Sequence, residues 1–402
     1  MGWRGCARSA TLATMAIRRT PFALLLACAA SGAPASAQWT ERLLVEETAG
    51  IRRTSFPATA RLELPASRLG DATRLRLVDA GTDVPVQGTA LSRWPDGSVR
   101  ALDVDFNVSM GPHEARALEL HYGDEIPAPA PVARGLSVTA ESGEIRVGRL
   151  RLGGSAPTVR SVAYREELVV EGRNGIALLD DRGAWRRTDV AWEPARVVKR
   201  GPLTVLIAYR GRLALDGARA ADVSVELELP NSKSWLNVSA SVSDPDRRLR
   251  AVAIETPLRL GEHPWTWDFA TPNGTYGAFR DEAASAVFSL ETASGAWRVR
   301  TGAPGDERPY EEGTGVPARA GAWAHVVGAR EAVAFAVETG SEAATLTARL
   351  DGAGQTAFEL APDQPATTLS LTLYQHYVST PVPIGAATSP ASILSPLRVT
   401  IR

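Results

Sequence analysis

Apolar and polar residues alternate along most of the chain, and this period of two constrains the fold more than any other feature. The alternation is unbroken over residues 102–108, and it returns over 224–229, 236–242, 369–374 and 397–401. Strands with this pattern bury one face and leave the other in water, which is typical of antiparallel sheets. No long segment carries the apolar period of 3.6 residues that marks a helix. The sequence therefore predicts an all-β fold.

The length of the chain, 402 residues, exceeds that of one ordinary domain. Residues 124–132 read DEIPAPAPV, a Pro-rich run that stiffens the backbone and is typical of a linker. We expect a small β-barrel domain over residues 38–123 and a large antiparallel β-sandwich over residues 133–402. No internal repeat decides whether the second part is one sandwich or two smaller layers.

The first 37 residues have the order of a secretory signal peptide. Arg18 and Arg19 supply the positive region, residues 22–30 form a short apolar core, and the small residues 35–37 provide a cleavage site before Gln38. The core is too short to span a membrane as a helix. The sequence therefore predicts export to the periplasm or the extracellular space, with residues 1–37 removed.

Three variants of this signal remain open. Met15 is an alternative start, because a complete signal follows it. Residues 25–28 resemble a lipidation motif, which would make Cys28 a lipid anchor, and Arg18-Arg19 fits a twin-arginine signal loosely.

Charge and cysteine content exclude several classes of partner and cofactor. The formal net charge of −1 gives no general case for nucleic-acid binding. Cys6 and Cys28 are the only cysteines, too few for a zinc–cysteine cluster or a disulfide scaffold. Asp103 and Asp105 begin a spacing like that of a calcium loop, but Val108 takes the position that needs glycine. We predict no metal and no cofactor.

Residues 93–100, RWPDGSVR, form the sharpest local signal. Pro95 presets the turn conformation, Asp96 suits the next position, and Gly97 tolerates a positive φ. The flanks have strand composition, so the stretch predicts a tight hairpin. Trp94 and Asp96 are interpreted as packing and turn residues, with ligand contact as the alternative.

One stretch, residues 263–280, differs from the rest because aromatic, acidic and basic side chains crowd together in it. If it is extended, Trp265 and Trp267 share one face. Aromatic rings cover the apolar faces of sugars, while carboxylate, amide and guanidinium groups bond to hydroxyls or carboxylates. The alternative is that the two tryptophans pack between domains. The residues predicted to bind substrate are His263, Trp265, Trp267, Asp268, Tyr276 and Arg280.

The first domain resembles the N-terminal RIFT-barrel domain of the exo-rhamnogalacturonan lyase-like family. The resemblance rests on residues 53–57, 75–79 and 84–87 and on SRWPDGSVRAL at residues 92–102. Residues 200–203, 234–238 and 242–245 are similar to the central β-sandwich of that family.

The resemblance implies an exported β protein associated with acidic or pectic glycans. Lyases of this family carry a further α-helical toroid domain that builds much of the active cleft, whereas this sequence ends in a strand at Arg402. No catalytic residue of the family matches a position here, so the catalytic residues are unknown.

Three functions follow as hypotheses. The first is a non-catalytic glycan-binding or accessory protein. The second is a polysaccharide lyase that acts on uronate-containing pectic glycans by β-elimination, with His263 as base, Arg280 neutralising the uronate and Tyr276 as acid. The third is a structural scaffold at the cell surface.

Overall fold

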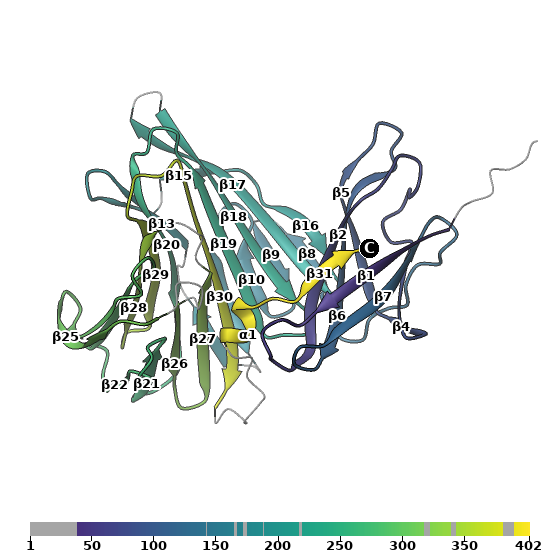
Figure 1. The fold of residues 1–402 in the computed structure, drawn as a ribbon. Coiled ribbons are helices and arrows are strands. Elements are labelled where there is room, and N and C mark those ends of the chain that lie inside the picture. Colours follow the sequence, from purple (N-terminus) through teal and green to yellow (C-terminus); the bar gives the residue numbers. More distant parts are fainter. Residues whose placement is uncertain are drawn as a thin grey trace, which may run out of the picture. The chain divides into compact units, whose positions relative to one another are not determined.

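The computed structural model describes residues 38–402 except 142, 165–166, 172–174, 188, 217–218, 317–321, 339–342 and 381–389. The predicted signal peptide, residues 1–37, lies outside the described residues. Within them the chain is nearly all strand, with a single short helix, α1 (Pro390–Leu394). All strand pairings in the described part are antiparallel, which confirms the all-β, antiparallel prediction (Figure 1). No helix in this part is long and apolar enough to cross a membrane.

Two sheets form the part of the chain that we call the N-terminal module, which comprises β1–β7 and β31. The first sheet has the strand order β31 (Arg398–Ile401), β1 (Trp39–Glu46), β7 (Ala115–Tyr122), β3 (Leu75–Asp79) and β4 (Thr82–Val84). The second has the order β2 (Arg53–Glu63), β6 (Val99–Met110) and β5 (Val86–Arg93). Both sheets contribute to one apolar core, which includes Leu43, Leu102 and Phe106.

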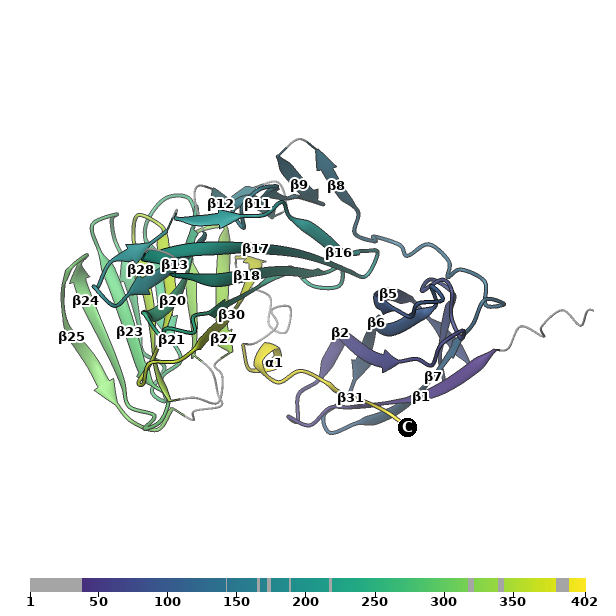
Figure 2. The same cartoon turned by 90° about the horizontal axis from the view of Figure 1, so that it is seen from above.

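The last strand belongs to this module, although the sequence assigns residues 133–402 to the sandwich. In β31, Ile401 pairs with Leu43 and Arg398 with Glu46, so the end of the chain completes the sheet that β1 begins. Figures 1 and 2 show α1 and β31 running back to β1. The pairing joins residues far apart in the sequence, which local alternation does not reveal.

The remaining strands, β8–β30, form three sheets that we call the sandwich. The eight-stranded sheet has the order β14 (Trp185–Arg186), β13 (Gly175–Asp180), β20 (Leu249–Pro257), β29 (Gln355–Pro362), β28 (Ala344–Asp351), β23 (Ser285–Glu291), β24 (Trp297–Ala303) and β25 (Asp306–Gly313). The ten-stranded sheet has the order β15 (Val190–Trp192), β17 (Thr204–Asp216), β18 (Arg219–Pro230), β19 (Trp235–Ser243), β30 (Thr368–Ser379), β27 (Glu331–Glu338), β26 (Ala322–Val327), β21 (Trp265–Phe269) and β22 (Tyr276–Phe279), with β16 (Arg196–Arg200) also on β17. A five-stranded sheet has the order β12 (Glu167–Glu171), β11 (Val159–Tyr164), β10 (Leu150–Gly153), β9 (Glu144–Val147) and β8 (Val138–Glu141).

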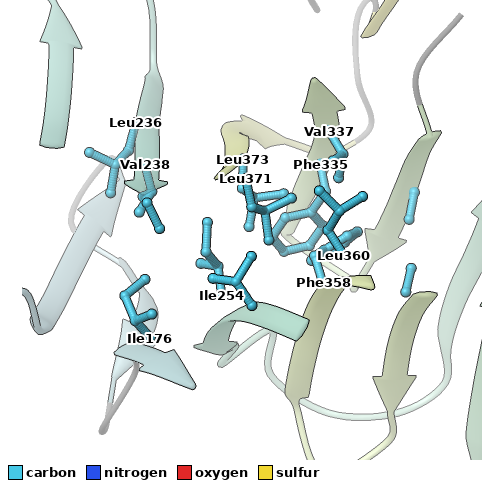
Figure 3. Close-up of a cluster of buried hydrophobic side chains, with 14 of the residues drawn as sticks. Ile176, Leu236, Val238, Ile254, Phe335, Val337, Phe358, Leu360, Leu371 and Leu373 are labelled. Carbon is cyan, nitrogen blue, oxygen red and sulfur yellow. The ribbon is translucent and has the colours of Figure 1, made fainter. Parts of the chain in front are cut away.

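The sandwich core lies between the eight-stranded and ten-stranded sheets. Figure 3 shows Ile254 and Phe358 of the first sheet beside Phe335 and Leu371 of the second. Alternate residues of the ten-stranded sheet point away from this core. We call that opposite surface the outer face; it carries the polar half of the alternation in β18, β19 and β30.

The outer face meets the N-terminal module through polar contacts as well as apolar ones. The side-chain amide of Gln87 donates to the carbonyl of Thr204 at 2.9 Å. The amide of Asn107 donates to Asn231 at 2.9 Å. Trp235 of the sandwich is buried in the same apolar cluster as the module's Phe56. These contacts hold the outer face against the N-terminal module.

The hairpin predicted at residues 93–100 is present between β5 and β6. Gly97 has a φ of 86°, which a β-branched residue would resist. Asp96 accepts hydrogen bonds from the backbone and hydroxyl of Ser98, and the indole of Trp94 donates to the carbonyl of Leu64 at 2.8 Å. These contacts agree with the interpretation of Trp94 and Asp96 as packing and turn residues.

Candidate functional site

The stretch 263–280 forms a hairpin of β21 and β22 at one edge of the ten-stranded sheet. Trp265 and Trp267 point into the sandwich core, and only 5% and 4% of their surfaces are exposed. The indole of Trp265 donates to the carbonyl of Gly261 at 3.1 Å, and the ring of Trp267 lies 5.2 Å from that of Phe269. Two buried indoles offer no exposed platform for a sugar, because alternation turns them inward. Core packing accounts for both.

Asp268 and Tyr276 occupy the outer face of the same hairpin, directly opposite each other. Nδ1 of His325 lies 2.9 Å from a carboxylate oxygen of Asp268. Tyr276 is 73% exposed, and its carbonyl accepts a hydrogen bond from the hydroxyl of Tyr310, which is also exposed. These residues form a small aromatic and polar surface at the edge of the sandwich.

The other two predicted residues lie at the ends of the hairpin. The ring of His263 stacks on Trp265 with centroids 4.5 Å apart, and its Nδ1 lies 3.3 Å from the carbonyl of Phe279. Arg280 is exposed just beyond β22. The six predicted residues are thus divided between the core, the outer face and the hairpin ends. None of them lines the cavity described next.

A cavity of about 280 Å³ lies where the outer face of the ten-stranded sheet meets the N-terminal module. Strands β18, β19 and β30 supply its floor, β2 supplies one wall, and the segment from α1 to β31 supplies another. The lining residues are Phe56, Pro57, Ala58, Thr59, Thr204, Glu228, Pro230, Trp235, Asn237, Tyr374, Ile393, Pro396 and Leu397.

Three polar side chains stand side by side on the cavity floor. The strand register pairs Glu228 with Asn237 and Asn237 with Tyr374, so they occupy neighbouring positions on β18, β19 and β30. Burial raises the pKa of Glu228, although the charge of nearby Lys199 opposes the shift. Burial also raises the pKa of Tyr374. The floor therefore presents one carboxyl group, one amide and one neutral phenol.

Aromatic rings form the apolar part of the cavity. The rings of Phe56 and Trp235 meet edge to face with centroids 5.7 Å apart. Trp235 meets Tyr374 in the same way at 6.5 Å. These contacts fix the rings next to the polar floor, because each ring is held by another.

A buried group of charges joins the two modules beside the cavity. Nζ of Lys199 on β16 lies 2.8 Å from a carboxylate oxygen of Asp105 and 3.2 Å from one of Asp103, both on β6. All three side chains are at most 4% exposed. Arg61 binds Asp103 at 2.8 Å from the solvent side, and the hydroxyl of Thr59, a cavity residue, donates to Asp105 at 2.6 Å. The group is continuous with the cavity wall.

Burial and pairing shift the acids of this group in opposite directions. Burial would raise the pKa of Asp103, but hydrogen bonds from Arg61 and the charge of Lys199 outweigh it, and the pKa is lowered. For Asp105 burial prevails, and the pKa is raised despite Lys199. Asp103 thus holds its charge more firmly than Asp105.

Two buried acceptor atoms at this place have no hydrogen-bond partner within the described part of the chain: Oδ1 of Asn237 and Oδ2 of Asp105. Leaving a buried polar atom unpaired costs about 1–3 kcal/mol, so an orphaned acceptor beside a cavity indicates a place for a donor.

The wall made by the segment after α1 is tied to the N-terminal module by a buried ion pair. Arg53 and Glu47 are 3.0 Å apart, and Arg53 also donates to the carbonyls of Ser392 and Ser395. Burial would raise the pKa of Glu47, but hydrogen bonds from the backbone of His113 and from Arg53 outweigh it and lower the pKa to about 2. The charged pair therefore persists across the neutral range and holds Ile393 and Leu397 against the cavity.

No motif in the sequence marks this cavity directly. Glu228, Asn237 and Tyr374 fall within three alternating segments and have the appearance of ordinary solvent-facing positions. One usable signal was the rarity of lysine: Lys199 and Lys233 are the only two in the chain. Among the described residues, no group of three or more His, Cys, Asp or Glu side chains is placed to hold a metal ion.

Comparison with solved structures finds the same fold in larger chains. An α-mannosidase from Enterococcus faecalis V583 is 9% identical, with a TM-score of 0.54 over 90% of this chain and 46% of the mannosidase. A glycosyl hydrolase family 38 protein from Enterococcus faecalis gives 9% identity and a TM-score of 0.52, over 90% of this chain and 47% of that chain. This chain therefore spans just under half the length of either structure.

A galactose mutarotase-like protein from Lactobacillus casei ATCC 334 matches more weakly. Its identity is 9% and its TM-score 0.32, over 61% of this chain and all of that chain. No protein-family model and no curated protein matches the sequence. The two matches with TM-scores above 0.5 thus show that this chain shares its fold with part of each Enterococcus faecalis structure.

Proposed function

We propose that the protein is an exported, non-catalytic glycan-binding protein and that the cavity above Glu228, Asn237 and Tyr374 holds the sugar. One observation carries the proposal: a carboxyl group, an amide and a phenol stand next to one another beneath fixed aromatic rings. Sugar sites combine these groups, because aromatic rings cover the apolar C–H faces and polar groups bond to the hydroxyls. The α-mannosidase fold adds support for a carbohydrate role.

The lining favours binding over β-elimination. A lyase needs a base near the acidic proton and a cation that neutralises the uronate carboxylate. Glu228 could act as a base, but the thirteen lining residues include no lysine, arginine or histidine. The resemblance noted in the sequence therefore supports a carbohydrate ligand more than a lyase reaction.

Glycan binding is expected to depend on Asn237. Isothermal calorimetry would compare the wild type with Asn237→Leu, using oligosaccharides from mannan, galactan and homogalacturonan. We expect at least one glycan to bind, and the variant to bind it at least 10-fold more weakly. Its melting temperature should fall moderately, because the variant also loses the hydrogen bond between Asn237 and Glu228. Leucine has a similar size but cannot bond to hydroxyls.

Ser239→Ala is the matched control, because Ser239 lies two residues further along the same face of β19 and bonds to Thr372 rather than lining the cavity. If no glycan binds the wild type, the proposal fails and a scaffold role takes its place. Release of unsaturated uronate from a pectic substrate would instead show that the protein is a polysaccharide lyase.

Export is the second part of the proposal. It is supported by the charged, apolar and small-residue order of residues 1–37. Sequencing the N-terminus of the protein recovered from its native cell envelope or medium should give Gln38. A mature chain that begins at a lipid-modified Cys28 would contradict cleavage at Ala37 and place the protein on a membrane.

A further inference from the structure

We infer that the cavity selects sugar residues that carry no carboxylate and discriminates against uronates. The inference deepens the proposed function, on which it rests, and it departs from the pectic ligand that the sequence resemblance implies. Its basis is the balance of charges and of hydrogen-bond donors around the cavity.

The charged groups around the cavity leave no cation available to a ligand. Glu228 is the one carboxyl group among the lining residues, and Asp103 and Asp105 lie immediately behind the wall formed by Thr59. The cations that face these three acids are Lys199 and Arg61. Both cations are already paired with the aspartates, so neither is left to meet a carboxylate from a ligand. Burial raises the pKa of Glu228, so a ligand carboxylate beside it is either repelled by the ionised form or forces Glu228 to take up a proton. Both outcomes weaken binding, and no cation offsets the cost of burying the ligand's charge.

The hydrogen-bond acceptors on the cavity floor also favour a neutral sugar over a uronate. The buried Oδ1 of Asn237 lacks a donor within the described chain, and the carboxylate of Glu228 accepts hydrogen bonds when ionised. Sugar hydroxyls donate, whereas the carboxylate of a uronate only accepts. A neutral sugar therefore satisfies this floor, and a uronate adds acceptors to a place already rich in them.

The discrimination is tested with matched ligand pairs that differ only in the exocyclic group. The methyl glycosides of galactose, glucose and mannose would be compared with those of galacturonate, glucuronate and mannuronate at pH 7, by ligand-observed NMR titration. For the wild type we expect at least one neutral glycoside to bind, and to bind at least 10-fold more tightly than its uronate.

Glu228→Gln keeps the shape of the side chain and removes its charge, so it should reduce that ratio to about 2-fold or less. Asp222→Asn is the matched control. Asp222 lies on the same face of β18, exposed and outside the lining, and its replacement should leave the ratio unchanged. The melting temperature of each variant confirms that it is folded.

Two results would overturn the inference. One is a uronate that binds the wild type as tightly as its neutral partner; the other is an unchanged ratio of neutral to uronate affinity in Glu228→Gln. Failure of all six monosaccharide ligands would also overturn it. Failure of the proposed function is a different result, in which none of the oligosaccharides from mannan, galactan and homogalacturonan binds the wild type.

Discussion

Replacing Lys199 by methionine is expected to lower the free energy of unfolding by about 3–5 kcal/mol, the usual cost of removing one partner from a buried ion pair. Lys199 is the cation between Asp103 and Asp105, and all three side chains are buried. Methionine fills much of the same space but leaves Asp105 with only the hydroxyl of Thr59. Urea unfolding followed by tryptophan fluorescence measures the loss.

The pH dependence of this loss identifies its cause. Burial would lower the pKa of Lys199, but the charges of Asp105 and Asp103 raise it above its ordinary value of 10.5. Lys199 therefore keeps its charge at every pH below that value, and the ion pairs are lost either when a strongly alkaline solution deprotonates Lys199 or when acid protonates the two aspartates. The pKa of Asp105 is already raised in the wild type, and without Lys199 it should rise further, so the folded variant binds more protons than its unfolded chain. The loss of unfolding free energy relative to the wild type should therefore shrink as the pH falls from 7 toward 5.

Lys233→Met is the control for this experiment, because Lys233 is the only other lysine. Its Nζ donates to the carbonyl of Thr54 at 2.7 Å, so its loss should cost about 1 kcal/mol or less. The double variant with Lys199→Met and Asp105→Asn should recover much of the lost stability. A deficit that is small, or equal at pH 7 and pH 5, would show that the cluster does not stabilise the fold as an ion pair.

Replacing Trp267 by alanine is expected to cost about 3–5 kcal/mol, the range for removing a large buried aromatic side chain. The indole is 4% exposed and lies within 6.1 Å, centroid to centroid, of Phe269, Phe279 and Tyr310. It also covers Gly277, where an added Cβ would lie 2.3 Å from the ring. The same chemical unfolding measurement applies. The fraction that remains folded should bind glycans as the wild type does.

Tyr276→Ala provides the matched comparison on the same hairpin. Tyr276 is 73% exposed, so its truncation should change stability by no more than about 0.5 kcal/mol. If the Trp267 variant kept its stability but lost glycan binding, the hypothesis that Trp267 stacks on a sugar would be supported instead. Lost glycan binding in Tyr276→Ala, with the fold intact, would move the site to the surface made by Tyr276, Tyr310 and His325.

The strands were predictable because the alternation of apolar and polar residues depends only on neighbouring positions in the sequence. Residues 102–108 lie in β6, residues 236–242 in β19 and residues 369–374 in β30, each with the expected buried face. Gly97 was predictable for a similar reason, since a turn requires only a few neighbouring residues.

The site was less predictable because it depends on which strands become neighbours. Glu228 and Tyr374 are brought together through β19, and Lys199 reaches Asp105 across two modules. The polar half of an alternating strand looks solvated in a sequence, yet Asp105 is 1% exposed. In the stretch 263–280, residue type likewise did not reveal that Trp265 and Trp267 face the sandwich core.

The pairing of β31 with β1 has a consequence for the order of synthesis. A ribosome makes the N-terminal module first, but one edge of β1 stays open until residues 398–401 have been added. An open strand edge is a template for pairing with other chains, and it stays so while the whole sandwich is being made. A chain that stops short of β31 keeps that edge and also loses the wall that Leu397 gives to the cavity. The segment 397–401 is therefore needed both to cover the edge of β1 and to complete the cavity wall.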